Sequence, residues 1–178
     1  ISLSEYLNTQ FTNCHFVPVY WMATEDHDFA EINHFFNEGK KFVWESEQEG
    51  AVGRFSTKGI ESIINALIGQ YTSAPFNDEL NTLLVDAYKE RSLSEATRKL
   101  VHQLFGDKGL VVIDADCKDL KGLATDLWLK ELKTSFSAIQ VAEQNTRLEA
   151  KGYPIQVNPR EINLFYLEEN KRTRITKE

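Results

Sequence analysis

The sequence predicts an α/β fold with a parallel sheet, because a helix, a buried strand and a second helix follow one another along the chain. The first helix is expected from Ser92 to about Phe105, where Ser92 and Glu95 have capping-box spacing and the apolar residues form one stripe. The apolar run GLVVIDAD at 109–116 indicates a buried strand. A helical pattern then resumes at 118–132.

The other elements are expected on either side of this unit. The run FVPVYWM at 16–22 is rich in β-branched and aromatic residues, which is typical of a strand covered on both faces. Gly106 is expected to end the preceding helix in the left-handed conformation. We further expect a strand at 40–46, a turn and edge segment at 51–59, helices at 60–70, about 78–90 and about 135–151, and strands at 162–167 and 172–176.

Composition and charge argue against a nucleic-acid-binding, membrane-spanning or secreted protein. The chain has 178 residues, 42% of them hydrophobic, and its net charge of -7 would repel a nucleic acid. The basic run at 170–177 is interpreted as a solvated strand or tail. No apolar run approaches the roughly 20 residues that cross a bilayer, and the first residues do not resemble a secretory signal, so we expect a soluble protein. Cys14 and Cys117 are expected to be reduced thiols of a cytoplasmic protein.

Two acidic segments follow the two best strands. ATEDHD comes after the strand at 16–22, and DADCKD begins with Asp114 and Asp116 at the end of the strand at 109–116. In open parallel sheets, ligands bind beyond the carboxyl ends of the strands. If the strands are neighbours, the segments can share a cleft. Asp114 and Asp116 could there bind a ribose, a metal or an amino group, or could cap the next helix.

The stretch WMATEDHDFAEINH at 21–34 combines acidic residues with two histidines. A helix is expected from near Asp28, because Phe29, Ile32 and Phe36 have the spacing of one buried stripe. His27, Glu31 and His34 would then fall together on the opposite face. Glu25 and Asp26 precede this helix, in the strand-to-helix turn.

Three interpretations of this stretch compete. Acidic residues at a helix start are favoured by the helix dipole, which alone explains Asp26 and Asp28. His27, Glu31 and His34 could instead bind a metal in a hydrolase, although HExxH is absent and no fourth ligand is identified. A carboxylate or His27 could also act as a general base, or hold an amine, in a cleft. From residue patterns alone, capping is favoured.

The segment GRFSTKG at 53–59 contains glycine and basic residues, which suggests a phosphate-binding loop. It matches neither the Walker pattern nor G-x-G-x-x-G. We therefore interpret it as a turn.

Three blocks in this order resemble the cysteine-adding enzymes of bacillithiol biosynthesis. They are VPVYWMATEDHDFAEINH, SLSEATRKLVHQLFGDKGLVVIDADCKDLK and REINLFYL followed by basic residues. The first block is the most specific, and the three together span about residues 16–175.

The resemblance implies a cytoplasmic ligase that joins L-cysteine, through its carboxyl group, to the amine of malyl glucosaminide. It implies a Rossmann-like core, a helical insertion and a coiled coil that makes homodimers, with ATP or another nucleotide and Mg²⁺ for activation. Asp26, His27 and Asp28 would be catalytic. The residues that would bind substrate are Trp21, Glu25, Glu31, Asn33, Asp114 and Asp116.

Family members are longer than this chain and carry a glycine- and glutamine-rich block ahead of the region. We therefore expect an internal piece of the enzyme, inactive by itself, with a partial Rossmann-like parallel sheet. Its expected parts are 1–59 as the first part of the core, 60–105 as the helical insertion and 106–178 as the continuation of the core. The alternatives are a structural or nucleotide-binding module, and the metal-dependent hydrolase described above.

Overall fold

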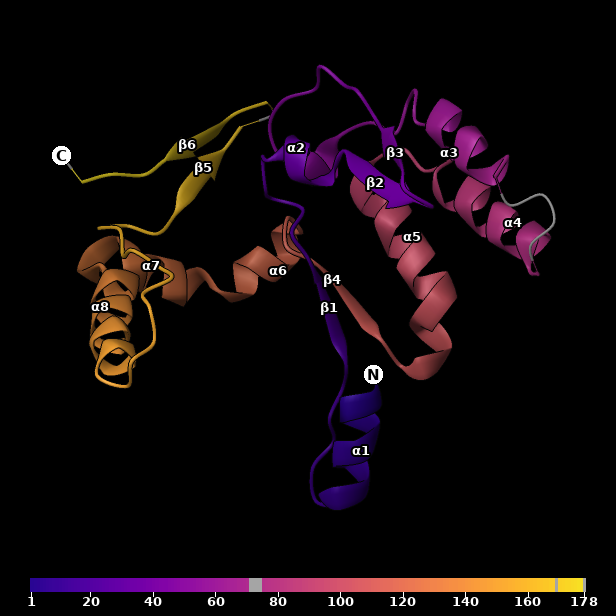
Figure 1. The fold of residues 1–178 in the computed structure, drawn as a ribbon. Helices are drawn as coiled ribbons and strands as arrows, with labels where there is room; N and C mark the ends of the chain where they lie inside the picture. Colours follow the sequence, from indigo (N-terminus) through magenta and orange to yellow (C-terminus); the bar gives the residue numbers. More distant parts are fainter. Residues whose placement is uncertain (71–74, 169, 178) are drawn as a thin grey trace. The chain divides into compact units, whose positions relative to one another are not determined.

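The structure, a computed structural model, describes residues 1–70, 75–168 and 170–177 (Figure 1). The chain divides into two units, Ile1–Asp116 and Cys117–Glu178. Within the described residues, no helix is both long and apolar enough to cross a membrane. The division of the chain that the sequence predicts, into 1–59, 60–105 and 106–178, stays a prediction.

The predicted parallel pairing is present in the first unit. Strand β1 (Val19–Met22) pairs in parallel with β4 (Val111–Asp114), and Figure 1 shows the two strands side by side. Helix α5 (Leu93–Phe105) precedes β4 and packs against it. Both strands are shorter than the apolar runs that predict them. The α/β class with a parallel sheet and flanking helices is confirmed.

These two strands are more exposed than their composition predicts. A strand of a parallel sheet is normally covered on both faces. Yet three of the four residues of β1 are exposed, and Trp21 keeps 64% of its surface. In β4, Val111 is exposed and the other residues are only half-buried. The prediction of two buried strands is therefore wrong, because the sheet that the described residues form has only two strands.

A β-hairpin replaces most of the helix that the spacing after Asp28 predicts. Helix α2 is only Phe29–Ile32, and the chain then enters β2 (His34–Asn37), which pairs antiparallel with β3 (Lys40–Val43). The turn Glu38–Gly39 has positive φ at both residues, 48° and 78°. Such two-residue turns match the twist of paired strands, so the chain reverses here instead of continuing the helix.

The hairpin changes the burial of the aromatic residues in this stretch. Phe29 is half-buried against the core, whereas Ile32 and Phe36 are exposed. The predicted buried stripe is therefore wrong after its first member. In the hairpin, Phe35 stands opposite Phe42 and their rings stack with centroids 5.1 Å apart. This cross-strand contact stabilises the hairpin and is impossible in a helix.

The core of the first unit is one cluster of buried side chains between the hairpin and three helices. Its buried members are Trp44, Val52, Phe55, Ile60 and Ile64. Phe29 packs against it, with its ring centroid 5.2 Å from those of both Trp44 and Phe55. The other partly buried residues come mainly from helices α3 (Glu61–Ile68), α4 (Asn77–Ala87) and α5.

Helix α5 begins as its sequence predicts but ends differently. The Ser92 hydroxyl accepts from the backbone N–H of Glu95 at 3.3 Å, and the Glu95 carboxylate accepts from the backbone N–H of Ser92 at 3.2 Å. The capping box is therefore confirmed. Gly106 is right-handed (φ -63°) and opens the 3₁₀ turn η2 (Gly106–Lys108). The left-handed residue is Gly109, with φ 71°, so the prediction for Gly106 is wrong.

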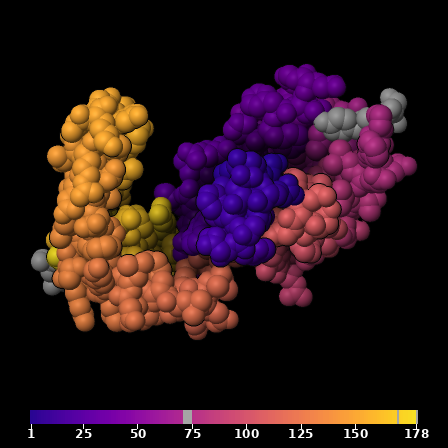
Figure 2. Space-filling view, turned by 90° about the horizontal axis from the view of Figure 1, so that it is seen from below, coloured from indigo at the N-terminus to yellow at the C-terminus, as the bar shows by residue number. Residues whose placement is uncertain are grey.

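Helix α1 (Ser2–Gln10) contains no buried residue, and Figure 2 shows it in indigo on the surface of the first unit. It is tied to the segment before β1 by Asn8. The Asn8 amide donates to the carbonyl of Phe16 at 2.9 Å and accepts from its backbone N–H at 2.7 Å.

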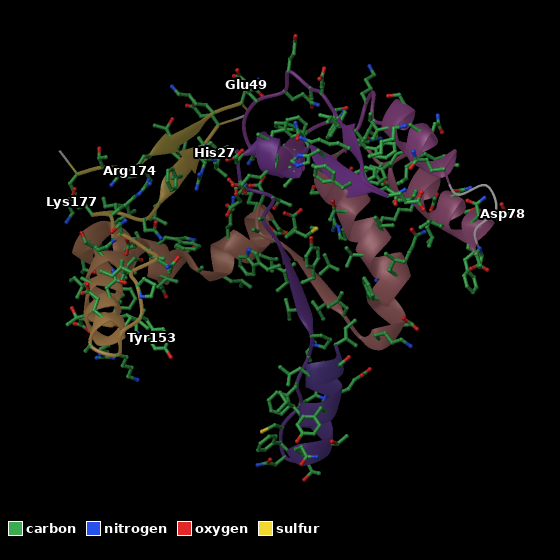
Figure 3. The ribbon with its side chains drawn as sticks, viewed as in Figure 1. His27, Glu49, Asp78, Tyr153, Arg174 and Lys177 are labelled. Atoms are coloured by element: carbon green, nitrogen blue, oxygen red, sulfur yellow. The ribbon has the colours of Figure 1, made fainter. Side chains whose placement is uncertain are left out.

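In its described residues, the second unit consists of three helices and a small hairpin. The helices are α6 (Lys118–Leu123), α7 (Thr125–Thr134) and α8 (Phe136–Glu149), and strands β5 (Phe165–Leu167) and β6 (Arg172–Arg174) pair antiparallel. The helical pattern predicted at 118–132 is interrupted at Ala124, so it forms two helices. Figure 3 shows Arg174 and Lys177 near the chain end.

One buried carboxylate links the parts of this second unit. Glu131 of α7 is only 3% exposed. Its Oε2 accepts from the backbone N–H of Ser137 at 2.7 Å, and its Oε1 accepts from that of Asn163 at 2.8 Å. Burial raises the pKa of Glu131, but these amide donors outweigh burial and hold the pKa below its usual 4.5. The ionised carboxylate therefore joins α7 to α8 and to the segment before β5.

Candidate functional site

The carboxyl ends of β1 and β4 bring the two acidic segments together. In the parallel register, Met22 stands opposite Asp114, so both strands end at the same edge of the sheet. Residues 23–28 follow β1, and residues 114–116 are the last residue of β4 and the two that follow it. Residues 52–54 pack beside both segments through hydrogen bonds. We call these three segments the carboxyl edge. The two acidic segments are thus neighbours within one unit, at the edge where open parallel sheets bind ligands.

Thr24 connects the two strand ends. Its side chain is buried, with 4% of the residue exposed. The hydroxyl donates to Oδ1 of Asp114 at 2.5 Å and accepts from the backbone N–H of Asp116 at 3.1 Å. That same N–H also lies 3.0 Å from Oδ1 of Asp114. Sequence reasoning missed Thr24, and its only sequence signal is a hydroxyl residue two positions after the strand.

The 3₁₀ turn η1 (Val52–Arg54) is fixed against the chain after β1. The backbone N–H of Val52 donates to the carbonyl of Asp26 at 2.7 Å, and that of Gly53 donates to the carbonyl of Thr24 at 2.9 Å. A Cβ on Gly53 would lie 2.4 Å from Cβ of Thr24 and 2.8 Å from its carbonyl oxygen. Only glycine allows this close approach.

We expect Gly53→Ala to lower the free energy of unfolding of the chain by about 1–3 kcal/mol, because the added methyl group must displace Thr24. Urea unfolding followed by tryptophan fluorescence measures the effect. Gly122→Ala is the matched control, since a Cβ there meets no atom within 4 Å. Equal stability of the two variants would contradict the close approach of η1.

Arg54 reaches from η1 to the end of β4. Its Nε donates to Oδ2 of Asp116 at 2.5 Å and its Nη2 donates to Oδ1 at 3.0 Å, so the pair is bidentate. The interpretation of GRFSTKG as a turn holds for its backbone, but it overlooked that this arginine belongs to the carboxyl edge.

Asp26 and His27 form a second polar pair. Oδ1 of Asp26 accepts from the backbone N–H of His27 at 2.7 Å and lies 3.2 Å from Nδ1 of the same residue. The backbone N–H of His27 lowers the pKa of Asp26 below its usual 3.8, so this carboxylate is ionised at neutral pH. Both side chains are about half exposed, and Figure 3 shows His27 beside α2. The pair has the arrangement of a base and the group that orients it.

The other predicted site residues take varied positions. Trp21 lies exposed near the end of β1, and Glu25 is half-buried in the loop that follows. Asp28 is the N-cap residue of α2, but its side chain makes no capping hydrogen bond. Glu31 is exposed on α2, and the Asn33 side chain lies 2.9 Å from a ring nitrogen of the next residue. The capping interpretation therefore does not explain Asp28.

The structure does not support the proposed metal ligands. The grouping of His27, Glu31 and His34 depends on one continuous helix, but His34 lies in β2 after α2 has ended. Among the described residues, no three His, Cys, Asp or Glu side chains are placed to hold a metal ion. The metal-dependent hydrolase therefore loses its geometric basis.

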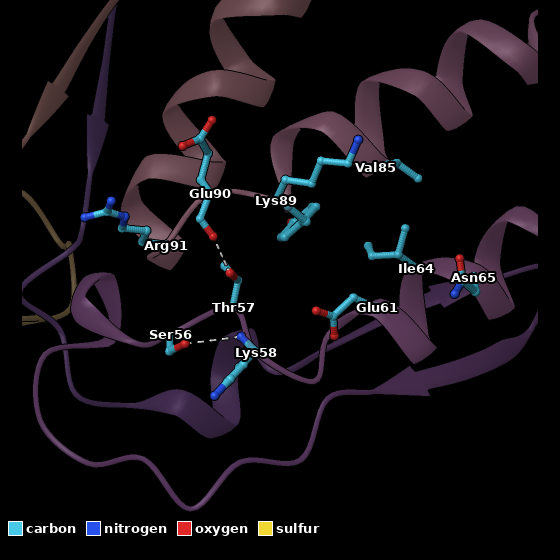
Figure 4. A pocket seen from close by; sticks show the side chains of 11 residues that line it. Ser56, Thr57, Lys58, Glu61, Ile64, Asn65, Val85, Lys89, Glu90 and Arg91 are labelled. Atoms are coloured by element: carbon cyan, nitrogen blue, oxygen red, sulfur yellow. Dashed lines mark hydrogen bonds between the residues drawn. The ribbon is translucent and has the colours of Figure 1, made fainter.

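A separate pocket of about 670 Å³ lies between the 56–58 segment, α3 and the α4–α5 connection (Figure 4). Glu61 points toward its centre, whereas Lys58 and Arg91 point away from it. Thr57 closes one side by donating to the carbonyl of Glu90 at 2.5 Å. Because the cations do not converge, the pocket does not form an anion site, and the carboxyl edge is the stronger candidate.

Comparisons with known proteins identify the family. The family model described as "Bacillithiol biosynthesis BshC, N-terminal Rossmann-like domain" matches residues 1–178. The chain is 45% identical over 179 residues to a Cytophaga hutchinsonii protein, covering 100% of the chain and 32% of that protein. It is 46% identical over 178 residues to one from Flavobacterium johnsoniae, covering 98% of the chain and 33% of that protein.

Both relatives are named "Putative cysteine ligase BshC". The chain spans about one third of their length. Since the family model covers the whole chain, the predicted resemblance and the Rossmann-like fold are confirmed, and this chain belongs to the bacillithiol biosynthesis BshC family as its N-terminal Rossmann-like domain.

Proposed function

We propose that the natural protein carrying this chain is an amide-forming ligase, which joins L-cysteine through its carboxyl group to the amine of malyl glucosaminide in the last step of bacillithiol synthesis. Family membership and the names of the relatives support a cysteine ligase. The observation that carries a catalytic role for this domain is the Asp26–His27 pair at the carboxyl edge.

In this proposal, His27 is the general base. With Nδ1 donating to the ionised Asp26, Nε2 carries the lone pair that accepts a proton from the attacking amine. The amine nitrogen bonds to the carbonyl carbon of the activated cysteine as the leaving group departs, and the proton moves to His27. Asp28, two residues from Asp26, adds negative charge near the ammonium form of the substrate.

The substrate would lie along the rest of the carboxyl edge. Trp21 offers an exposed aromatic face for the sugar. Asp114 offers a carboxylate oxygen to the amine, and Asp116, held by Arg54, offers the remaining lone pairs of its carboxylate to hydroxyl groups. Glu25, Glu31 and Asn33 would bind more distant polar groups of the substrate. The acidic character of the edge suits an amine better than it suits an anion.

Activation of the cysteine carboxyl group needs an energy source, for which we propose ATP or another nucleotide with Mg²⁺. The described residues form no three-ligand cluster, so such an ion would rest mainly on the phosphates of the nucleotide. We also propose that the full-length protein is a cytoplasmic homodimer.

The test is product formation by the natural protein supplied with malyl glucosaminide, L-cysteine and ATP. Mass spectrometry should detect the cysteinyl product, and omission of any one substrate should abolish it. The isolated 178-residue chain is expected to bring about no turnover. A protein that binds these substrates without making product would indicate a structural or nucleotide-binding module instead.

A further inference from the structure

Arg54 is the only lysine or arginine in the three segments of the carboxyl edge. Residues 23–28, 52–54 and 114–116 carry five carboxylates, namely Glu25, Asp26, Asp28, Asp114 and Asp116. Like charges that crowd together repel one another, so the single guanidinium has a large influence on where these carboxylates point.

Both the backbone and the guanidinium of Arg54 are held in place. Its backbone belongs to η1, which is held by the carbonyls of Thr24 and Asp26 and has no room for a side chain at Gly53. Its guanidinium binds both oxygens of Asp116, whose side chain is only 13% exposed. A bidentate pair sets direction as well as distance. The pair therefore joins two segments 62 residues apart in sequence.

The carboxylates of Asp114 and Asp116 differ in how many of their oxygens are already hydrogen-bonded. Both oxygens of Asp116 are engaged by Arg54. Asp114 uses Oδ1 alone, which accepts from the Thr24 hydroxyl and the backbone N–H of Asp116. Within the described part of the chain, Oδ2 of Asp114 accepts no hydrogen bond, so it is available to a substrate N–H or O–H.

We propose that Arg54 is a positioning residue: by holding Asp116, it keeps the end of β4 and Asp114 oriented so that Oδ2 of Asp114 accepts from the amine of the substrate. This inference rests on the proposed ligase function. Without Arg54, the Asp116 carboxylate loses this bidentate contact and competes with Asp114 for the amine and for the Thr24 hydroxyl. Substrate binding is then weakened more than the chemical step.

Steady-state kinetics of the natural protein test the proposal. Arg54→Ala should raise KM for malyl glucosaminide by about 10- to 100-fold, with kcat changed by less than about threefold. Arg54→Lys should recover part of this loss, since lysine restores the charge but not the bidentate geometry. Lys58→Ala is the matched control, because it removes a cation from the same GRFSTKG segment outside the edge, and it should keep the wild-type KM.

The double variant Arg54→Ala/Asp116→Asn separates positioning from a general structural role. It should have a lower KM than Arg54→Ala alone, because residue 116 no longer carries a charge that competes with Asp114 for the amine. A wild-type KM in Arg54→Ala, or an equal rise in Lys58→Ala, would overturn the inference. So would a fall in kcat at unchanged KM, the result of fewer folded molecules. A wild-type protein that makes no product would instead refute the proposed function, and this inference with it.

Discussion

In the ligase reaction proposed for the natural protein, replacing His27 with alanine is expected to lower kcat by about 100- to 10,000-fold, the usual contribution of a general base. The reason is the loss of the imidazole that Asp26 orients at the carboxyl edge. The side chain is 59% exposed and contributes little to the core, so the folded protein should persist. The measurement is initial velocity by mass spectrometry at saturating substrates, with circular dichroism to confirm the fold.

Two further variants distinguish the loss of the base from the loss of its orientation and from a nonspecific effect of removing a histidine. Asp26→Asn should reduce kcat less than His27→Ala, because the imidazole remains and only its orientation is weakened. His15→Ala removes another exposed histidine of the same unit, outside the carboxyl edge, and should leave kcat unchanged. Unchanged turnover in His27→Ala would remove His27 from the proposed mechanism and return the acidic stretch to a role in structure alone.

Replacing Glu131 with alanine is expected to lower the free energy of unfolding of the second unit by roughly 2–5 kcal/mol, because each buried unsatisfied amide costs about 1–3 kcal/mol. The backbone N–H groups of Ser137 and Asn163 would both lose their acceptor. Hydrogen exchange of these two amides measures the effect directly, and both should exchange faster. Glu143→Ala, at an exposed position of α8, is the matched control and should leave them protected.

The same carboxylate predicts a pH dependence with a definite sign. The pKa of Glu131 is lower in the folded chain than its usual 4.5, so the ionised group contributes its full stability above that pH. This contribution is lost as the pH falls through the folded pKa. Urea unfolding between pH 7 and pH 3 should therefore show a smaller loss in Glu131→Gln than in wild type. Identical pH profiles would show that Glu131 does not stabilise the fold as an anion.

Local sequence patterns predict the fold best where the stabilising contacts are themselves local. The capping box at Ser92 and Glu95 lies within four residues and appears as predicted. The helix expected after Asp28 fails, because stacking of Phe35 on Phe42 across a hairpin replaces the i, i+3, i+7 stripe. The pattern of apolar residues allowed both outcomes. Cross-strand contacts and a turn with positive φ decided between them.

The candidate site was only partly predictable for the same reason. Asp26, His27 and Asp114 stand out because they follow apolar runs, where parallel sheets bind ligands. Thr24, Gly53 and Arg54 lack such a signal. Their importance comes from contacts with residues far away in the sequence, such as the Thr24 hydroxyl with Asp114 and the Arg54 guanidinium with Asp116.

By itself, the sequence determined the α/β class, the capped start of helix α5 and the family to which the chain belongs, because periodicity and motif strings are properties of neighbouring residues. The tertiary structure alone decided which polar groups meet. Parallel pairing of β1 with β4 set Met22 opposite Asp114, and the close approach of η1 carried Arg54 to the same edge. These placements depend on strand register and packing across the unit, which no local pattern encodes.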